Sequence, residues 1–276
     1  MNYFTPAEFV ENYEALGEKK ANTPALKLFL LGILAGLLIG FAGVTTNTAS
    51  HAFDNVSVIR TISGLLFPFG LVMVILVGTE LFTGNCLITI SVLSNRTTAL
   101  KMLRNLGIVY FGNFIGAILL AVACAYFGQF NYSHGELAVY TIKVATAKCS
   151  LPFANAFVMG VLCNILVCVA VMCAMCAKDI AGKVLGAYVP ICFFITCGFE
   201  HSIANMYYIP AGLFALSVPK YAELAAAAGM DVSNLTWSNF FVANLVPVTL
   251  GNIVGGVGFA VIMWYCYKKQ SSKKTK

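Results

Sequence analysis

Long apolar stretches separated by short polar segments form the main pattern of this 276-residue chain. A run of about 20 apolar residues is long enough to cross the hydrocarbon core of a bilayer as a helix. The pattern therefore predicts an all-α membrane protein with six transmembrane helices. The six stretches lie at residues 27–49, 58–93, 100–127, 152–177, 184–216 and 238–267.

The second and fifth stretches are too long for a single straight crossing. At about 1.5 Å per residue each would reach about 50 Å, whereas the hydrocarbon core is about 30 Å thick. Glycine and polar residues interrupt the second stretch at 78–85 and the fifth at 198–201. We expect both helices to be broken at these positions.

Short sequence matches between the two halves of the chain indicate an internal repeat. A three-helix unit used twice must enter the membrane from opposite sides, because three is odd. Inverted repeats with broken helices at equivalent positions indicate a binding or permeation site near the midplane of the membrane. The matches, in the same order in both halves, pair 32–39 with 160–167 (offset 128), 78–80 with 198–200 (offset 120), and 112–116 with 251–255 (offset 139).

Composition and charge fit a membrane protein and define its orientation. Hydrophobic residues make up 59% of the chain and charged residues only 10%, whereas soluble domains carry about 25% charged residues. Of the 17 Lys and Arg residues, 13 lie on the side of both termini, and Arg60, Lys143, Lys148 and Lys220 lie on the other side. Basic residues concentrate in cytoplasmic segments, so we expect both termini in the cytoplasm. The net charge of +6 follows from this topology, and no nucleic-acid partner is predicted.

The chain divides into three parts around the apolar region. The polar segment 1–26 lacks the order of a cleaved signal peptide, and it predicts a cytoplasmic helix on the membrane surface with Phe4, Phe9 and Leu16 on one side. Residues 27–267 form a single transmembrane channel domain, with the repeats at about 27–127 and 152–267. Residues 268–276 form a basic cytoplasmic tail.

Titratable residues at membrane depth are the strongest candidates for function, because a charge in the bilayer is costly unless it is paired or faces a pathway. Glu80 and Glu200 lie at the two breaks, where we favour acceptance of free backbone N–H groups over proton relay. His201 follows Glu200 and is predicted to take part in permeation. The alternative is a structural histidine that bonds Thr83 or a backbone carbonyl.

The ten cysteines lie mostly in apolar stretches, where a cysteine behaves as a small hydrophobic residue. Cys173 and Cys176 have the C-x-x-C spacing of redox and metal sites. No histidine or second cysteine pair lies nearby. We therefore predict no metal and no cofactor.

Four segments resemble the formate/nitrite transporter family: FPFGL at 67–71, ELFTGN at 80–85, GFEHSIANM at 198–206 and NLVPVTLGN at 244–252. Within the family the chain is most similar to the hydrosulfide-channel branch. The resemblance implies an aquaporin-like fold, a homopentamer, and a multi-pass position in the inner (plasma) membrane. It implies that hydrosulfide, formate and nitrite are candidate solutes and that the protein is embedded in the lipid bilayer.

The resemblance also implies roles for individual residues. His201 and Thr83 correspond to the pore centre. Lys148 corresponds to a basic position in the outer vestibule, and Asn164 and Asn252 to polar lining positions. The apolar constrictions correspond to Phe67, Leu71, Phe82 and Phe194.

These residues lead to a functional prediction. An anion that enters an apolar constriction loses hydration worth tens of kcal/mol in the idealised limit. Attraction by Lys148, hydrogen bonds from Thr83, and a proton or hydrogen bond from His201 would offset that cost. Histidine suits this role because its ordinary pKa is about 6.5. We therefore predict a passive, pH-sensitive channel for small monovalent anions or their conjugate acids, and not an enzyme.

Three alternatives remain open from the sequence. A proton-coupled formate or nitrite transporter would use the same residues. A neutral-solute pore would fit the fold, but the chain lacks the paired Asn-Pro-Ala motifs of water channels. A membrane redox enzyme would use Cys173 and Cys176.

Overall fold

Residues 3–269 are described by a computed structural model of the protein. Six helical segments in this part of the chain are long and apolar enough to cross a membrane, which confirms the predicted fold class. Their outward faces carry large exposed apolar side chains such as Leu30, Phe111 and Ile262. The segments are α2 (Ala25–Ser50), α3 with α4 (Val56–Leu66 and Pro68–Val77), α7 (Ala99–Tyr126), α9 (Phe153–Cys176), α10 (Ile180–Cys197), and Trp237–Lys268.

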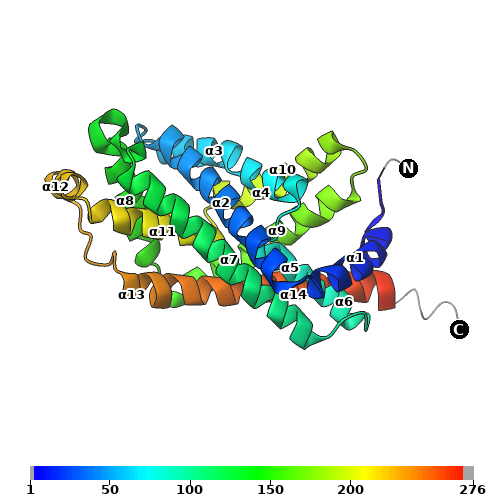
Figure 1. The fold of residues 1–276 in the computed structure, drawn as a ribbon. Coiled ribbons are helices and arrows are strands. Elements are labelled where there is room, and N and C mark those ends of the chain that lie inside the picture. The colour runs from blue at the N-terminus through cyan, green and yellow to red at the C-terminus, as the bar shows by residue number, and fades with distance from the viewer. Residues whose placement is uncertain (1–2, 270–276) are drawn as a thin grey trace, which may run out of the picture.

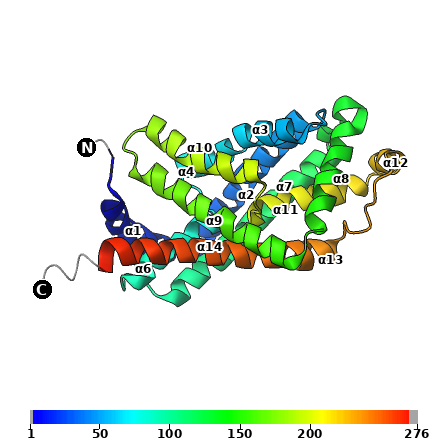
Figure 2. The same ribbon diagram turned by 180° about the vertical axis from the view of Figure 1, so that it is seen from behind.

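The sixth segment consists of four consecutive helical elements. It begins as α13 (Trp237–Asn239) and η3 (Phe240–Leu245), continues as α14 (Val246–Trp264), and ends as η4 (Tyr265–Lys269). In both halves the first helix of the unit packs on the third, α2 on α7 and α9 on α14. Figure 2 shows α9 crossing α14.

The two expected helix breaks are present, and each occurs at a left-handed glycine. Helix α4 ends at Val77 and α10 at Cys197, and the next residues, Gly78 and Gly198, both have φ of +75°. Only glycine adopts this conformation without a steric penalty. After the first break the chain forms α5 (Phe82–Asn85), η1 (Cys86–Ile88) and α6 (Thr89–Leu93); after the second it forms α11 (Ser202–Leu216).

Helix α1 (Pro6–Ala21) packs on the protein at the end where the described chain begins and ends (Figure 1). Thr5 and Glu8 form a capping box that starts the helix. Phe9 and Tyr13 are buried against α6 and α14 in one apolar cluster with Ile90 and Met263. Protein side chains therefore cover this face of the expected surface helix.

Three further helices lie at the opposite end of the molecule, in segments between the predicted membrane crossings (Figures 1 and 2). They are η2 (Gln129–Gly135), α8 (Glu136–Cys149) and α12 (Pro219–Ala227). Helix α8 packs against α11 and carries Lys148 in its last turn. The second half of the broken fifth crossing is therefore covered by a helix rather than by a loop.

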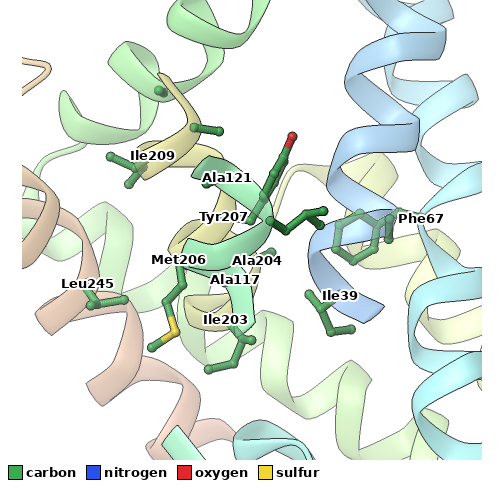
Figure 3. Packing of buried hydrophobic residues seen from close by; sticks show 14 of the residues in the cluster. Ile39, Phe67, Ala117, Ala121, Ile203, Ala204, Met206, Tyr207, Ile209 and Leu245 are labelled. Atoms are coloured by element: carbon green, nitrogen blue, oxygen red, sulfur yellow. The ribbon is translucent and has the colours of Figure 1, made fainter. Parts of the chain in front are cut away.

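Helix α11 lies at the centre of the largest apolar cluster (Figure 3). Its residues Ile203, Met206 and Tyr207 are fully buried, beside Ala117 of α7 and near Phe67 at the α3–α4 junction. This packing holds the start of α11, and with it His201, in the middle of the molecule.

Candidate functional site

A buried polar network supports the first helix break. Lys20 Nζ lies 2.8 Å from Glu80 Oε2, to which Asn85 Nδ2 also donates at 2.7 Å. Asn85 donates again to Asn105 Oδ1 at 2.8 Å, and Asn105 Nδ2 donates to the Lys20 carbonyl at 2.9 Å. The network closes on itself, so the carboxylate is paired with Lys20 and accepts two hydrogen bonds at Oε2, and a buried charge needs such partners.

The second break has the same network. Lys148 Nζ lies 2.8 Å from Glu200 Oε1, and Asn205 Nδ2 donates to Glu200 Oε2 at 2.6 Å. Asn205 donates again to Asn244 Oδ1 at 2.7 Å, and Asn244 Nδ2 donates to the Lys148 carbonyl at 2.9 Å. Each member corresponds to one of the first network at an offset of the sequence repeat. The pairs are Lys20 and Lys148 (128), Glu80 and Glu200 (120), Asn85 and Asn205 (120), and Asn105 and Asn244 (139).

Asparagines from the third helix of each repeat bind the free backbone groups at the breaks. Asn113 Oδ1 accepts the N–H of Phe82 at 3.0 Å, and its Nδ2 donates to two backbone carbonyls, at 2.8 and 2.9 Å. Asn252 Oδ1 accepts the N–H of Ser202 at 2.9 Å, and its Nδ2 donates to two carbonyls, at 2.8 and 3.0 Å. The expectation that Glu80 and Glu200 accept these N–H groups is wrong: the carboxylates bind lysine and asparagine side chains instead.

Asn164 also donates to backbone rather than to open space. Its Nδ2 lies 2.6 Å from the carbonyl of Asn252 and 3.3 Å from that of Thr83. Asn164 and Asn252 are both completely buried, and neither lines the two voids described below. Asn164 connects α9 to the residue that faces His201.

His201 and Thr83 bring the two breaks together. The imidazole Nε2 lies 2.9 Å from Thr83 Oγ1, and both side chains are buried. Nδ1 accepts a hydrogen bond from the N–H of Ala204 at 3.1 Å, so His201 caps the N-terminus of α11.

The hydrogen bonds of His201 define its tautomer. Because Nδ1 accepts from a backbone amide, it carries no proton, and the neutral ring holds its proton on Nε2. We assign this tautomer from the network. Nε2–H therefore donates to Thr83, whose own hydroxyl hydrogen makes no other hydrogen bond within residues 3–269. That hydrogen remains available to a third partner.

A small apolar void adjoins His201. Its volume is about 10 Å³, close to the minimum of about 10–15 Å³ that holds one water molecule. Phe67 and Phe194 form an edge-to-face pair at 6.0 Å on one side of it, and Phe194 stacks on His201 at 6.1 Å. The lining residues are Ile39, Phe67, Leu71, Leu81, Val167, Ile191, Phe194 and His201.

A second, larger cavity of about 440 Å³ lies at the end of the molecule that carries α1. Leu71 and Leu81 line both voids and so separate them. Phe82 lines neither; its ring packs edge-to-face on Tyr110 at 4.8 Å.

The repeat explains why the site is chemically asymmetric. Leu81 and His201 are equivalent at the offset of 120 residues, and both line the void beside the two breaks. One half of the molecule thus contributes an aliphatic side chain and the other an imidazole. Among the residues that line the small void, His201 is the polar one.

Arg60 is a charged residue near the site that the sequence argument did not select. Its guanidinium lies against the left-handed Gly198, so closely that a Cβ there would stand 2.7 Å from Nη1. No ion pair of Arg60 occurs within the described part of the chain, whereas Lys148 is paired with Glu200. A signal was present, because Arg60 is one of only four basic residues on its side of the sequence.

The chain is similar to proteins of one family over nearly its whole length. The family model described as formate/nitrite transporter matches residues 7–267. The formate channel FocA of Haemophilus influenzae is 37% identical over 91% of this chain and 90% of its own. A solved structure described as a pentameric formate channel with formate bound has a TM-score of 0.79 and 35% identity, covering 89% of this chain and 98% of that one.

The fold extends beyond this family. The aquaglyceroporin of Plasmodium falciparum has a TM-score of 0.53 at 16% identity, covering 90% of this chain and 99% of its own. At this identity the similarity concerns the fold alone, and it supports the aquaporin-like arrangement of six crossings.

Proposed function

The chain belongs to the formate/nitrite transporter family, and from this premise we propose that it forms a passive, pH-sensitive channel for formate and related small monovalent anions or their conjugate acids. The observation that carries the proposal is the buried His201–Thr83 pair, whose imidazole lines the small apolar void. The proposed path runs from the large cavity, past Leu71 and Leu81, to the small void, and out between Phe67 and Phe194.

The small void supports a gated passage rather than an open pore. A space of about 10 Å³ holds at most one water molecule, so formate enters only when the bordering side chains rotate. Leu71 and Leu81 form the inner constriction, and Phe67 and Phe194 the outer one. We assign no constriction role to Phe82, because its ring packs on Tyr110.

Thr83 supplies the hydrogen bond that the solute needs in this apolar space. Nε2–H of His201 donates to Thr83 Oγ1, which orients the hydroxyl hydrogen away from the ring and toward a solute oxygen. Hydrogen bonds to charged groups are worth about 1.5–3 kcal/mol each. Consecutive hydrogen bonds, such as His201 to Thr83 to the solute, also strengthen one another. Thr83 therefore offsets part of the desolvation of the anion.

The tautomer of His201 supports hydrogen-bond donation over proton donation. A neutral ring that gave up its Nε2 proton would become an imidazolate unless Nδ1 gained a proton, and Nδ1 faces the N–H of Ala204. Acid acts in the other direction: a proton on Nδ1 breaks the bond to Ala204 and removes the cap of α11. We attribute the pH sensitivity to this loss of the cap.

Orientation, assembly and alternative solutes complete the proposal. The excess of basic residues at the end with both termini supports cytoplasmic termini and a multi-pass position in the inner membrane. The exposed apolar side chains on the outward helix faces and the pentameric formate channel of similar fold support a homopentamer in the bilayer.

We place formate first among the solutes and keep nitrite and hydrosulfide as candidates. We assign attraction of the anion on the outer side to the exposed Arg60 and, next to it in importance, to Lys148, whose ammonium is also paired with Glu200.

The test is flux through purified protein in liposomes, measured for formate, nitrite and hydrosulfide from pH 5 to 8, with His201→Asn as the variant. Asparagine is a good helix N-cap, so this change keeps the cap of α11 while it removes the imidazole. We expect formate flux that follows its concentration gradient and a pH dependence that disappears in the variant. Unchanged pH dependence in the variant would remove His201 from the mechanism.

A further inference from the structure

The large cavity at the α1 end has properties that passage of a small anion does not require. We propose that it is a binding site for an organic anion with two or more negative groups, and that an occupant stops the passage of smaller anions. This inference rests on the proposed channel function and adds a ligand class and a mode of regulation to it. The cavity volume of about 440 Å³ falls in the range of about 300–1,000 Å³ typical of sites for organic ligands.

The charge of the cavity lining is strongly positive. Four lysines and one glutamate line it, which gives a net charge of +3. Lys20 is committed to Glu80 and Asn85, at 2.8 and 3.1 Å. The remaining three are Lys19, Lys27 and Lys183, and no hydrogen bond or ion pair of their ammonium groups occurs within residues 3–269.

These three lysines come from three separate elements. Lys19 lies in the last turn of α1, Lys27 in the first turn of α2, and Lys183 near the start of α10. A cation in the first turn of a helix is unfavourable to the helix dipole, and no acidic residue compensates Lys27 within that turn. Its position costs stability unless an anion lies opposite it.

The rest of the lining defines the body of the ligand. Leu31, Val74, Ile75 and Met175 are among the lining residues and form an apolar wall. The ligand therefore has carboxylate or phosphate groups that bind the lysines, and an apolar body that packs against this wall. Formate has no such body and would use only the positive charge.

An occupant of this cavity lies across the proposed path. The cavity shares Leu71 and Leu81 with the void beside His201, and that void measures about 10 Å³. A ligand that fills the cavity is too large to continue past the two leucines. It therefore blocks the smaller anion instead of following it.

The experiment uses isophthalate, a rigid aromatic dianion, as the probe and benzoate as its singly charged analogue. Formate efflux from proteoliposomes is measured with either compound present on both sides of the membrane, at a constant ionic strength set with chloride. Binding of isophthalate to the purified protein is measured separately by calorimetric titration. The test variant is Lys27→Gln/Lys183→Gln. The control is Lys101→Gln/Arg104→Gln, which removes the same charge from the same end, outside the cavity lining.

We expect isophthalate to block efflux at a concentration about three- to fivefold below that of benzoate, because a second charged contact forms. The test variant should raise the half-blocking concentration and the dissociation constant of isophthalate by about fivefold or more, and the control by less than about twofold. Equal block and binding in wild type and test variant would overturn the site. Absence of formate flux without isophthalate would instead refute the channel function, while the titration would still decide whether the dianion binds.

Discussion

Replacing Thr83 by valine removes a hydroxyl while it preserves the size and shape of the side chain. Thr83 is completely buried, and its Oγ1 lies 2.9 Å from His201 Nε2. In the proposed mechanism its hydroxyl hydrogen is the donor to the passing anion. A hydrogen bond to a charged group is worth about 1.5–3 kcal/mol, which corresponds to a rate decrease of about 10- to 150-fold if the bond forms at the barrier.

The assay is uptake of labelled formate into proteoliposomes, normalised to the amount of inserted protein. Thr89→Val is the matched control. Thr89 is also buried and lies in the same segment after the first break, but it donates to the Cys86 carbonyl at 2.8 Å. Thr83→Ser retains the donor and should keep most of the flux. If Thr83→Val transports formate within about twofold of the wild type while Thr89→Val behaves normally, the hydroxyl is not the donor.

Two further predictions concern the breaks and the outer entrance. Asn252→Leu leaves the N–H of Ser202 and two carbonyls without their partners, so it should destabilise the protein by about 2 kcal/mol or more in thermal unfolding in detergent. The control is Asn234→Leu, at an exposed position. Equal melting temperatures for the two variants would contradict the role of Asn252 in holding the second break. Arg60→Gln should slow formate entry by roughly two- to fivefold at low ionic strength and match the wild type at high salt, because salt screens the attraction between an exposed charge and a distant anion. A deficit that is independent of salt, or an equal deficit in Lys220→Gln at the same end, would exclude steering by Arg60.

The membrane crossings and the breaks were predictable because they depend on local chemistry. An apolar run longer than the bilayer, interrupted by glycine and a carboxylate, has few ways to fold. Gly78 and Gly198 adopt the same left-handed conformation, as their shared sequence context indicated. The repeat offset of 139 residues also relates Asn113 to Asn252, the two asparagines that bind the backbone at the breaks.

The partners of the buried carboxylates were not predictable, because they come from distant elements. Lys20 lies in the N-terminal helix and Lys148 in α8, and neither looks like part of a membrane core in the sequence. The segment that forms α8 is not recognised as a helix from the sequence because it contains two lysines and two threonines, whereas packing against α11 stabilises it as a helix.

Side-chain direction explains the remaining differences. Leu81 has extended backbone and Phe82 begins α5, so the two neighbours point to different sides, and the sequence does not say which one faces the small void. Leu81 lines both voids, and Phe82 turns toward Tyr110. Arg60 lies far from Gly198 along the chain, and only the packing of α3 on α10 brings them together.

The most direct test of the account is the structure of the protein determined at high formate concentration. The account predicts density for formate between Phe67 and Leu71, with a carboxylate oxygen within hydrogen-bonding distance of Thr83 Oγ1 and with Nδ1 of His201 still bound to the amide of Ala204. Formate bound elsewhere in the protein, with the space beside His201 and Thr83 empty, would contradict it.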